Sequence, residues 1–391
     1  MAFHVIDHDT KTIDDLNAKV PPIDGSGTEQ DPFLVGDSML LKIGIDSNYP
    51  LDAYYKQIKD IDLSSVPSWT PIGTTPLPLP SETPFTGHYD GNNYEIQNLN
   101  IDETTSLPAY GKGLFGLNKG IIENVKLTNV NITYSNGNSS SNFYGGIAGK
   151  NEGNGIIKNC YVQGDINFDV SIGSQSQVGL IVGVNRSIIE NCYSEGNVTG
   201  RQYVGGICGA NGVGQSYEAV VRNCWSTSNV VVGSFNNAGG IVGQNWGIVE
   251  YCYSTGTVGG LPGTGSSGIG GIVGLNQYQS LLECSIVQNC YFTGSIINVS
   301  NSSGGIIGNA QRMLSYMSYV KCYNCYSKIT ATGEGTGGDI NGYSGTSFTN
   351  EYTLQSWHED PSKWLDNEAW DFTNIWKWDS LNNRPILQWQ D

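Results

Sequence analysis

Three glutamates recur at one position of a repeated sequence block and are the first candidates for acid–base chemistry. Glu123, Glu190 and Glu250 each stand directly before an Asn or a Tyr. Paired carboxylates can hydrolyse a glycosidic bond, one as the acid and the other as the base or nucleophile. Lys158 and Arg222 occupy the same position in the intervening blocks. We therefore interpret the glutamates as part of an alternating charge column rather than as a catalytic pair.

A second recurring position carries aromatic side chains that could bind a ligand. Tyr193, Trp225 and Tyr253 occupy it in consecutive blocks, three residues after the charged position. Strand alternation places these rings outside the fold, where flat faces with polar edges suit sugars and protein partners. The alternative is an aromatic ladder that stabilises the sheet, or one that another subunit covers. The three residues are candidate binding residues.

Long insertions mark a third candidate surface. From the closing glycine of a block to the next Asn position, the chain advances 14, 15 and 16 residues after Gly209, Gly274 and Gly308, against 8 or 10 elsewhere. Insertions on one face of a repeat array are often where binding occurs. The candidate recognition residues in or beside these insertions are Tyr217, Tyr278, Leu281, Leu282, Arg312, Met313, Tyr316 and Tyr319.

Metal and nucleophile chemistry has little support in the sequence. His4, Asp7, His8 and Asp9 could bind a metal, but terminal clusters of this kind usually do not. No Gly-x-Ser-x-Gly sequence stands out from the glycine-rich background. We expect no catalytic residue, no metal and no cofactor.

The candidate residues are positioned by an internal repeat. A short apolar block bracketed by glycines recurs seven times, and successive closing glycines are 26 to 34 residues apart. Such a period indicates a solenoid, a propeller or an array of repeats. The seven blocks are residues 113–116, 146–149, 179–183, 206–209, 240–243, 271–274 and 305–308.

A second block follows each of the first ones, and both kinds are short and β-branched. That composition predicts strands, whereas ankyrin and tetratricopeptide arrays need helical periodicity. A propeller blade needs four strands and about 40 residues, more than this repeat offers. We therefore predict an all-β parallel β-helix, whose coils stack about 4.8 Å apart so that equivalent positions form columns.

Two further columns follow from this register. The first suits a bend, with amides that hydrogen-bond from coil to coil, and contains Asn124, Asn159, Asn191, Asn223, Tyr251, Asn289 and Asn324. The second is small and apolar, and contains Val125, Cys160, Cys192, Cys224, Cys252, Cys290 and Cys325. Nine cysteines cannot all pair within one chain, and we expect them to be buried and mostly reduced.

These blocks resemble the GLUG motif repeat, named for its Gly-Leu-x-Gly core, of large bacterial and archaeal surface proteins, adhesins and some phage-related proteins. The segments 27–34, 60–63, 85–92, 370–372 and 384–387 resemble parts of such chains as well. The resemblance covers roughly residues 27–391 and implies a right-handed parallel β-helix. It supplies no family catalytic residue.

The chain divides into four expected segments. Residues 1–26 form an N-terminal arm for attachment or packing, residues 27–112 an N-terminal cap with the first coils, and residues 113–330 the seven-repeat β-helix. Residues 331–391 hold six of the nine tryptophans and form a C-terminal cap over the unpaired strand edges.

Charge and hydropathy exclude several classes of function. The 391 residues carry a net charge of −17, and only 14% of them are charged. An acidic surface repels nucleic acid and anionic membranes. No apolar run approaches the roughly 20 residues of a membrane span, and the first residues lack the pattern of a secretory signal. We expect no nucleic-acid partner and no membrane insertion.

The sequence thus predicts a non-enzymatic surface-recognition protein at a virion surface or outside a cell. Our first hypothesis is a virion tail-fibre or receptor-binding protein that contacts a host-surface glycan or protein, with the N-terminal arm attached to assembly proteins. The alternatives are a cell-surface adhesin without its signal and anchor, and a β-helix polysaccharide depolymerase. A homo-oligomer is compatible with an aromatic column that another subunit covers.

Overall fold

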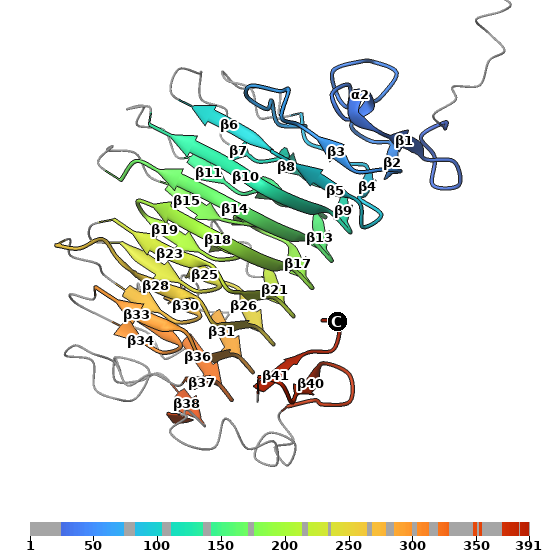
Figure 1. Cartoon of the computed structure of the whole chain (residues 1–391). Helices are drawn as coiled ribbons and strands as arrows, with labels where there is room; N and C mark the ends of the chain where they lie inside the picture. The colour runs from blue at the N-terminus through green and yellow to red at the C-terminus, as the bar shows by residue number, and fades with distance from the viewer. Residues whose placement is uncertain are drawn as a thin grey trace, which may run out of the picture.

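The computed structural model is an all-β solenoid of stacked parallel coils (Figure 1). Each regular coil passes through four sheets, which we name D, C, A and B in chain order, and neighbouring coils pair in parallel register. The prediction of an all-β parallel solenoid is confirmed. The structure describes residues 25–73, 83–103, 111–135, 142–170, 176–212, 218–233, 236–263, 268–278, 285–298, 303–312, 320–327, 347–349, 352–353, 370–382 and 384–390.

Two of the sheets run almost the whole length of the described solenoid. Sheet A consists of β1 (Phe33–Val35), β2 (Tyr54–Gln57), β4 (His88–Asp90), β9 (Ile121–Glu123), β13 (Ile156–Lys158), β17 (Ile188–Glu190), β21 (Val220–Arg222), β26 (Ile248–Glu250), β31 (Ser285–Gln288), β36 (Val320–Tyr323) and β38 (Ser347–Thr349). Sheet B consists of β3 (Ile61–Asp62), β5 (Glu95–Gln97), β6 (Asn100–Glu103), β10 (Lys126–Tyr134), β14 (Tyr161–Phe168), β18 (Tyr193–Gly200), β22 (Trp225–Ser226), β23 (Asn229–Val232), β27 (Tyr253–Ser254), β28 (Thr257–Gly260), β32 (Tyr291–Phe292), β33 (Ser295–Ile297), β37 (Tyr326–Ser327) and β39 (Tyr352–Thr353).

The glycine-bracketed blocks separate the other two sheets. Sheet D consists of β7 (Gly111–Lys112), β11 (Asn142–Tyr144), β15 (Ser176–Gly179), β19 (Tyr203–Gly205), β24 (Asn237–Gly239), β29 (Gly268–Gly270) and β34 (Ser303–Gly304). Sheet C consists of β8 (Phe115–Asn118), β12 (Ala148–Asn151), β16 (Val182–Asn185), β20 (Cys208–Asn211), β25 (Val242–Asn245), β30 (Val273–Tyr278) and β35 (Ile307–Arg312). An antiparallel hairpin of β40 (Trp376–Asp379) and β41 (Arg384–Leu387) stands outside the stack.

From the second block on, the closing glycine is required because sheets C and D approach each other backbone to backbone. A Cβ atom on Gly243 in β25 would lie 2.4 Å from the backbone nitrogen of Val204 in β19 and 2.6 Å from the carbonyl oxygen of Gly209. Real Cβ atoms do not come that close to backbone, so any larger residue would force the coils apart. The apolar residue two positions before the closing glycine is buried in the interior, as for Ile147, Ile181, Ile207, Ile241, Ile272 and Ile306.

The bend between sheets A and B is built by the predicted asparagine column. Its residues have φ angles of 50–55°, in the left-handed region that Asn tolerates better than most residues, and Tyr251 adopts the same conformation. The side-chain amide of Asn159 donates to Asn124 Oδ1 at 3.2 Å, and that of Asn191 donates to Asn159 Oδ1 at 3.0 Å. The predicted bend and its coil-to-coil amide ladder are confirmed.

The predicted cysteine column lies in the interior. Cys160 is 2% exposed, and the other five cysteines of the column are fully buried. The eight described cysteines are all free thiols. Burial raises the pKa of the column thiols from Cys160 to Cys290 well above the ordinary value, and that of Cys208 to about 12.

We therefore expect the eight described cysteines of the native protein to resist thiol reagents at pH 8, because a thiol that is buried and protonated is a poor nucleophile. Denaturation without reductant should then release at least eight of the nine cysteines as free thiols. Titration with an aromatic disulfide reagent, before and after addition of guanidinium chloride, measures both states. A denatured, non-reduced protein with only one free thiol would contradict the structure.

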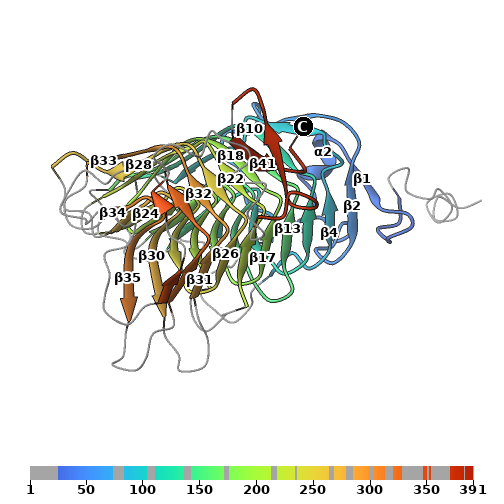
Figure 2. The ribbon, with the colours of Figure 1, turned by 90° about the horizontal axis from the view of Figure 1, so that it is seen from below.

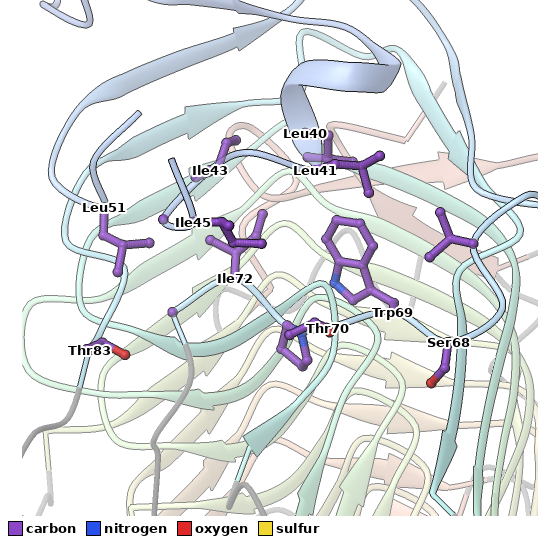
Figure 3. A pocket seen from close by; sticks show the side chains of 14 residues that line it. Leu40, Leu41, Ile43, Ile45, Leu51, Ser68, Trp69, Thr70, Ile72 and Thr83 are labelled. Carbon is purple, nitrogen blue, oxygen red and sulfur yellow. The ribbon is translucent and has the colours of Figure 1, made fainter. Parts of the chain in front are cut away.

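The N-terminal end of the solenoid is closed by apolar packing around the helix α2 (Asp37–Leu40). Met39 and Leu40 are buried, and Trp69 donates its indole N–H to the carbonyl oxygen of Leu114 at 3.0 Å. An apolar pocket of about 280 Å³ lies beside the helix, with Ile43 and Ile72 among its lining residues (Figure 3). Residues 74–82, between two lining residues, lie outside the described part of the chain. Within that part no helix is long and apolar enough to cross a membrane.

Candidate functional site

The predicted charge column is a real stack on the outer face of sheet A. Glu190 pairs in register with Lys158 on one side and with Arg222 on the other, and Arg222 pairs with Glu250. Arg222 donates to Glu190 Oε2 at 2.5 and 2.8 Å, and Lys158 Nζ lies 2.9 Å from Glu123 Oε2. The register prediction is confirmed.

The contacts of the three glutamates favour charge balance over catalysis. Glu123 also contacts His88 Nε2 at 2.7 Å, and Glu250 accepts a hydrogen bond from Gln288 at 2.7 Å. Burial raises the pKa of Glu123, but the bonds to Lys158 and His88 outweigh it, so the pKa lies below the usual range. A lowered pKa suits a paired anion and not a proton donor at neutral pH.

The Arg222 pair should contribute little to stability because its groups are partly exposed. We expect Arg222→Met to change the free energy of unfolding by less than about 1 kcal/mol. Arg222→Glu should cost more, since it stacks three carboxylates in adjacent coils, and the additional loss should shrink in high salt. Denaturant titration of both variants at low and high salt tests this. A salt-independent loss in Arg222→Glu would show that repulsion is not the cause.

The aromatic column forms a continuous stack of rings on the outer face of sheet B. Ring centroids lie 5.0 Å apart for Tyr161 and Tyr193, 3.5 Å for Tyr193 and Trp225, and 5.5 Å for Trp225 and Tyr253. The interplanar angles in this run are 5–24°, so each ring presents its face to the ring of the next coil. Most ring faces inside this run are therefore occupied by neighbouring rings.

The chain itself covers the C-terminal half of this aromatic column. Tyr253, Tyr291 and Tyr326 are at most 1% exposed and pack with Trp370 and Trp376. The prediction that Tyr253 is an exposed binding residue is therefore wrong, whereas Tyr193 and Trp225 are partly exposed. The covering element is the hairpin of β40 and β41, which lies along the side of the solenoid (Figure 2).

Polar contacts fix the hairpin against the column. The hydroxyl of Tyr291 donates to the carbonyl oxygen of Pro385 at 2.5 Å, and the hydroxyl of Tyr253 bonds with the Gln390 side chain at 3.0 Å. The Trp389 indole N–H donates to the carbonyl oxygen of Asn223 at 3.1 Å. The described tryptophans of the segment thus lie along the side of the solenoid, and Trp370 reaches Tyr326 of the last regular repeat. Trp357 and Trp364 lie outside the described residues.

A groove opens where the hairpin ends. Its volume is about 360 Å³, and it runs along the asparagine column beside the first rings of the stack. All the described residues that line it are uncharged: Asn93, Asn124, Asn159, Cys160, Tyr161, Tyr193 and Trp389. This amide-and-aromatic groove, which we call the Asn–Tyr groove, is our candidate functional site.

The rings of the groove are held in place by the polar groups around them. The Tyr193 hydroxyl donates to Glu195 Oε2 at 2.8 Å, and the Tyr161 hydroxyl reaches the same oxygen at 3.4 Å. Burial, together with the Glu195 carboxylate, raises the pKa of Tyr161 to about 12, so its hydroxyl stays protonated at neutral pH. The groove therefore presents a neutral, ordered surface.

Two of the predicted insertion residues lie in the part of the chain that the structure describes. The backbones of Tyr278 and Arg312 pair in register at the ends of β30 and β35, so two of the three insertions start side by side. The remaining candidates lie outside the described residues: Tyr217, Leu281, Leu282, Met313, Tyr316 and Tyr319. The cluster His4, Asp7, His8 and Asp9 lies outside them as well.

Sequence reasoning missed one residue of the groove and one ladder inside the solenoid. The sequence places Trp389 in the predicted end cap. Its contact with the backbone of Asn223 could not be predicted, because the two residues are 166 positions apart and no local pattern marks the contact. A second asparagine ladder also went unnoticed, although an Asn stands two residues after six of the seven closing glycines. Its members are fully buried, and each of the first five donates to the next at 2.8–2.9 Å: Asn118, Asn151, Asn185, Asn211, Asn245 and Asn276.

Comparison with a family model identifies the repeat. The GLUG motif matches residues 144–167, 174–199, 236–259 and 265–297, which together with the solenoid architecture shows that the chain carries GLUG repeats. Among the described residues, no group of three or more His, Cys, Asp or Glu side chains is placed to hold a metal ion.

Curated relatives share part of this chain. Halomucin from Haloquadratum walsbyi is 32% identical over 153 residues, or 38% of the chain, and a provisionally named Gly-rich membrane protein from Evansella cellulosilytica is 31% identical over 147 residues, or 36%. The chain spans 2% and 15% of the lengths of these relatives. It is therefore similar to small segments of much longer proteins.

A solved structure shares the fold over almost the full length. A provisionally named immunoglobulin A1 protease from Bacteroides ovatus superimposes with a TM-score of 0.53 and 22% identity, covering 94% of this chain and 95% of that one. At this identity the likeness shows the fold alone, because one solenoid supports many functions.

Proposed function

We propose that this GLUG-repeat chain is a non-enzymatic recognition segment of a surface-exposed protein, and that it binds a glycan or a protein on another surface. The Asn–Tyr groove carries the proposal, because uncharged amides and rings stand there on a scaffold whose ladders already fix their positions. A preordered site loses little conformational entropy on binding. The relative named as a membrane protein supports a location at the cell boundary.

Two settings fit a surface-recognition protein. The curated relatives come from an archaeon and a bacterium, which favours a cell-surface adhesin. The free, buried thiols favour a virion tail-fibre or receptor-binding protein, which is synthesised in a reducing cytoplasm before it works outside the cell. The neighbouring genes distinguish the settings, since virion assembly genes accompany a tail protein.

Binding to whole cells and to immobilised glycans tests the proposed function. We expect the fluorescently labelled chain to bind saturably to at least one cell type or glycan, and to release no new reducing ends from it. Release of reducing ends would favour the depolymerase instead. Absence of binding to every cell and glycan would contradict recognition by this chain.

The insertions are a second proposed contact surface, suited to a protein partner. Deleting residues 278–282 and replacing residues 313–319 with a short Gly/Ser turn should preserve the coils, because the pairing strands β31 and β36 remain. We expect this variant to lose binding to a protein partner on cells. Unchanged binding by the folded variant would assign recognition to the groove.

A further inference from the structure

We propose that the Asn–Tyr groove binds a neutral, linear oligosaccharide, with Tyr161 as the stacking platform and Asn124 and Asn159 as hydrogen-bonding partners of sugar hydroxyls. The inference rests on the proposed function and names the ligand class of the same groove. Three features of the groove carry it: a ring at the end of the aromatic stack, a repeating array of amides, and the absence of charge among its described lining residues.

Tyr161 is the first ring of the stack and so has a face that no ring of the stack covers. Its register partner in the preceding coil is Lys126, whose Nζ lies 3.8 Å from Glu95 Oε2. The other face of Tyr161 lies on Tyr193. Tyr161 lines the groove, and a flat ring suits the apolar face of a sugar; the partly exposed Trp389 lines the groove as a second aromatic group.

The ladder bonds of Asn124 and Asn159 use only half of the hydrogen-bonding groups of these two amides. Asn159 donates one N–H to Asn124 Oδ1, and Asn124 donates one to Asp90 Oδ1 at 2.8 Å. A primary amide has two N–H donors and two acceptor lone pairs, and these ladder bonds use one of its donors. The remaining groups repeat with the coil spacing of about 4.8 Å, so they suit a ligand that is itself a chain of similar units.

The groove offers a peptide strand nothing to pair with. Strand addition needs a sheet edge with unpaired backbone groups. Here the backbone N–H of Tyr161 donates to Val125 at 2.9 Å, and that of Tyr193 donates to Cys160 at 2.9 Å. The uncharged lining and the net charge of −17 also disfavour polyanions. A neutral glycan satisfies the amides and the ring without an edge or a charge.

Calorimetric titration of the full chain with neutral hexasaccharides tests this inference. The probes are the hexamers of cellulose, xylan, mannan and chitin, with a hyaluronan hexamer as the charged comparison. We expect at least one neutral hexamer to bind, and Asn159→Gly and Tyr161→Val each to weaken it roughly tenfold or more. Glycine tolerates the left-handed backbone of Asn159, and valine keeps the strand that contains Tyr161.

Asn324→Gly is the matched control. Asn324 has the same left-handed backbone and donates to Asn289 Oδ1 at 3.2 Å, but it is not among the residues that line the groove. The affinity of the Asn324→Gly variant for the hexamer should equal that of the unaltered chain. Equal weakening in the control, or binding of the charged hexamer alone, would overturn the inference. So would cell binding that no neutral hexamer competes, an outcome in which the proposed recognition function still stands.

Discussion

Asn185→Ala should lower the free energy of unfolding by about 3 kcal/mol or prevent the central coils from forming. Asn185 is fully buried in the inner ladder and donates to Asn211 Oδ1 and to the Ser187 carbonyl at 2.8 and 2.9 Å. Its own oxygen accepts from Asn151 at 2.8 Å and from the Ser187 backbone at 3.2 Å. Truncation leaves several buried partners without a bond, and no water replaces the amide at low cost.

An exposed asparagine of sheet B, Asn197, supplies the control for this prediction. Asn197 donates to Asp165 at 2.8 Å and accepts from Asn229 at 3.0 Å, but it lies in solvent. Asn197→Ala should therefore change stability by no more than about 0.5 kcal/mol. Denaturant midpoints followed by circular dichroism compare the two variants. Equal losses would show that burial of the inner ladder is not what makes it important.

Trp376→Ala should release the C-terminal hairpin while the solenoid stays folded. Trp376 is fully buried, and its ring centroid lies 4.7 Å from that of Trp370 and 5.8 Å from that of Tyr291. Removing a buried tryptophan costs about 3–5 kcal/mol, which here falls on the docking of the hairpin. Amide exchange within β40 and β41 should accelerate by roughly a hundredfold or more, because 1.4 kcal/mol corresponds to a factor of ten.

Hydrogen exchange read by mass spectrometry distinguishes local release from global unfolding. Peptides containing β17 and β21 should keep their protection, since the hairpin cluster does not include their side chains. Trp389→Ala is the matched control, because Trp389 is 37% exposed and makes one hydrogen bond to the solenoid backbone. Loss of protection throughout the Trp376→Ala variant would mean that the hairpin and the coils unfold as one unit.

Positions that repeat were predictable from the sequence, and positions that do not repeat were not. Glu190, Arg222 and Glu250 revealed their register because opposite charges alternate along a stack. The cysteine and outer asparagine columns followed from the same alignment of blocks. The inner asparagine ladder was equally regular, but an Asn close to a Gly predicts an ordinary turn, and only the structure shows that these residues are buried.

The side position of the hairpin could not be derived in this way. Tyr253 alternates with inward residues in the sequence just as Tyr193 does, and only the docking of Trp376 and Gln390 makes one of them buried. The contact between Tyr253 and Gln390 joins residues 137 positions apart and is not repeated along the chain, so a repeat pattern cannot predict it. The candidate groove could not be predicted for the same reason, because Trp389, which follows the hairpin strands, lines it together with repeat residues.

The alternating charge column constrains how such a protein can change length over evolutionary time. Loss of the single coil that carries Arg222 would bring Glu190 against Glu250, two like-charged residues on strands about 4.8 Å apart. Loss of two adjacent coils, those of Glu190 and Arg222, would instead bring Lys158 against Glu250 and keep the alternation. Glycine, cysteine and asparagine columns accept any number of coils. Selection on this face therefore favours duplication and deletion in pairs of coils.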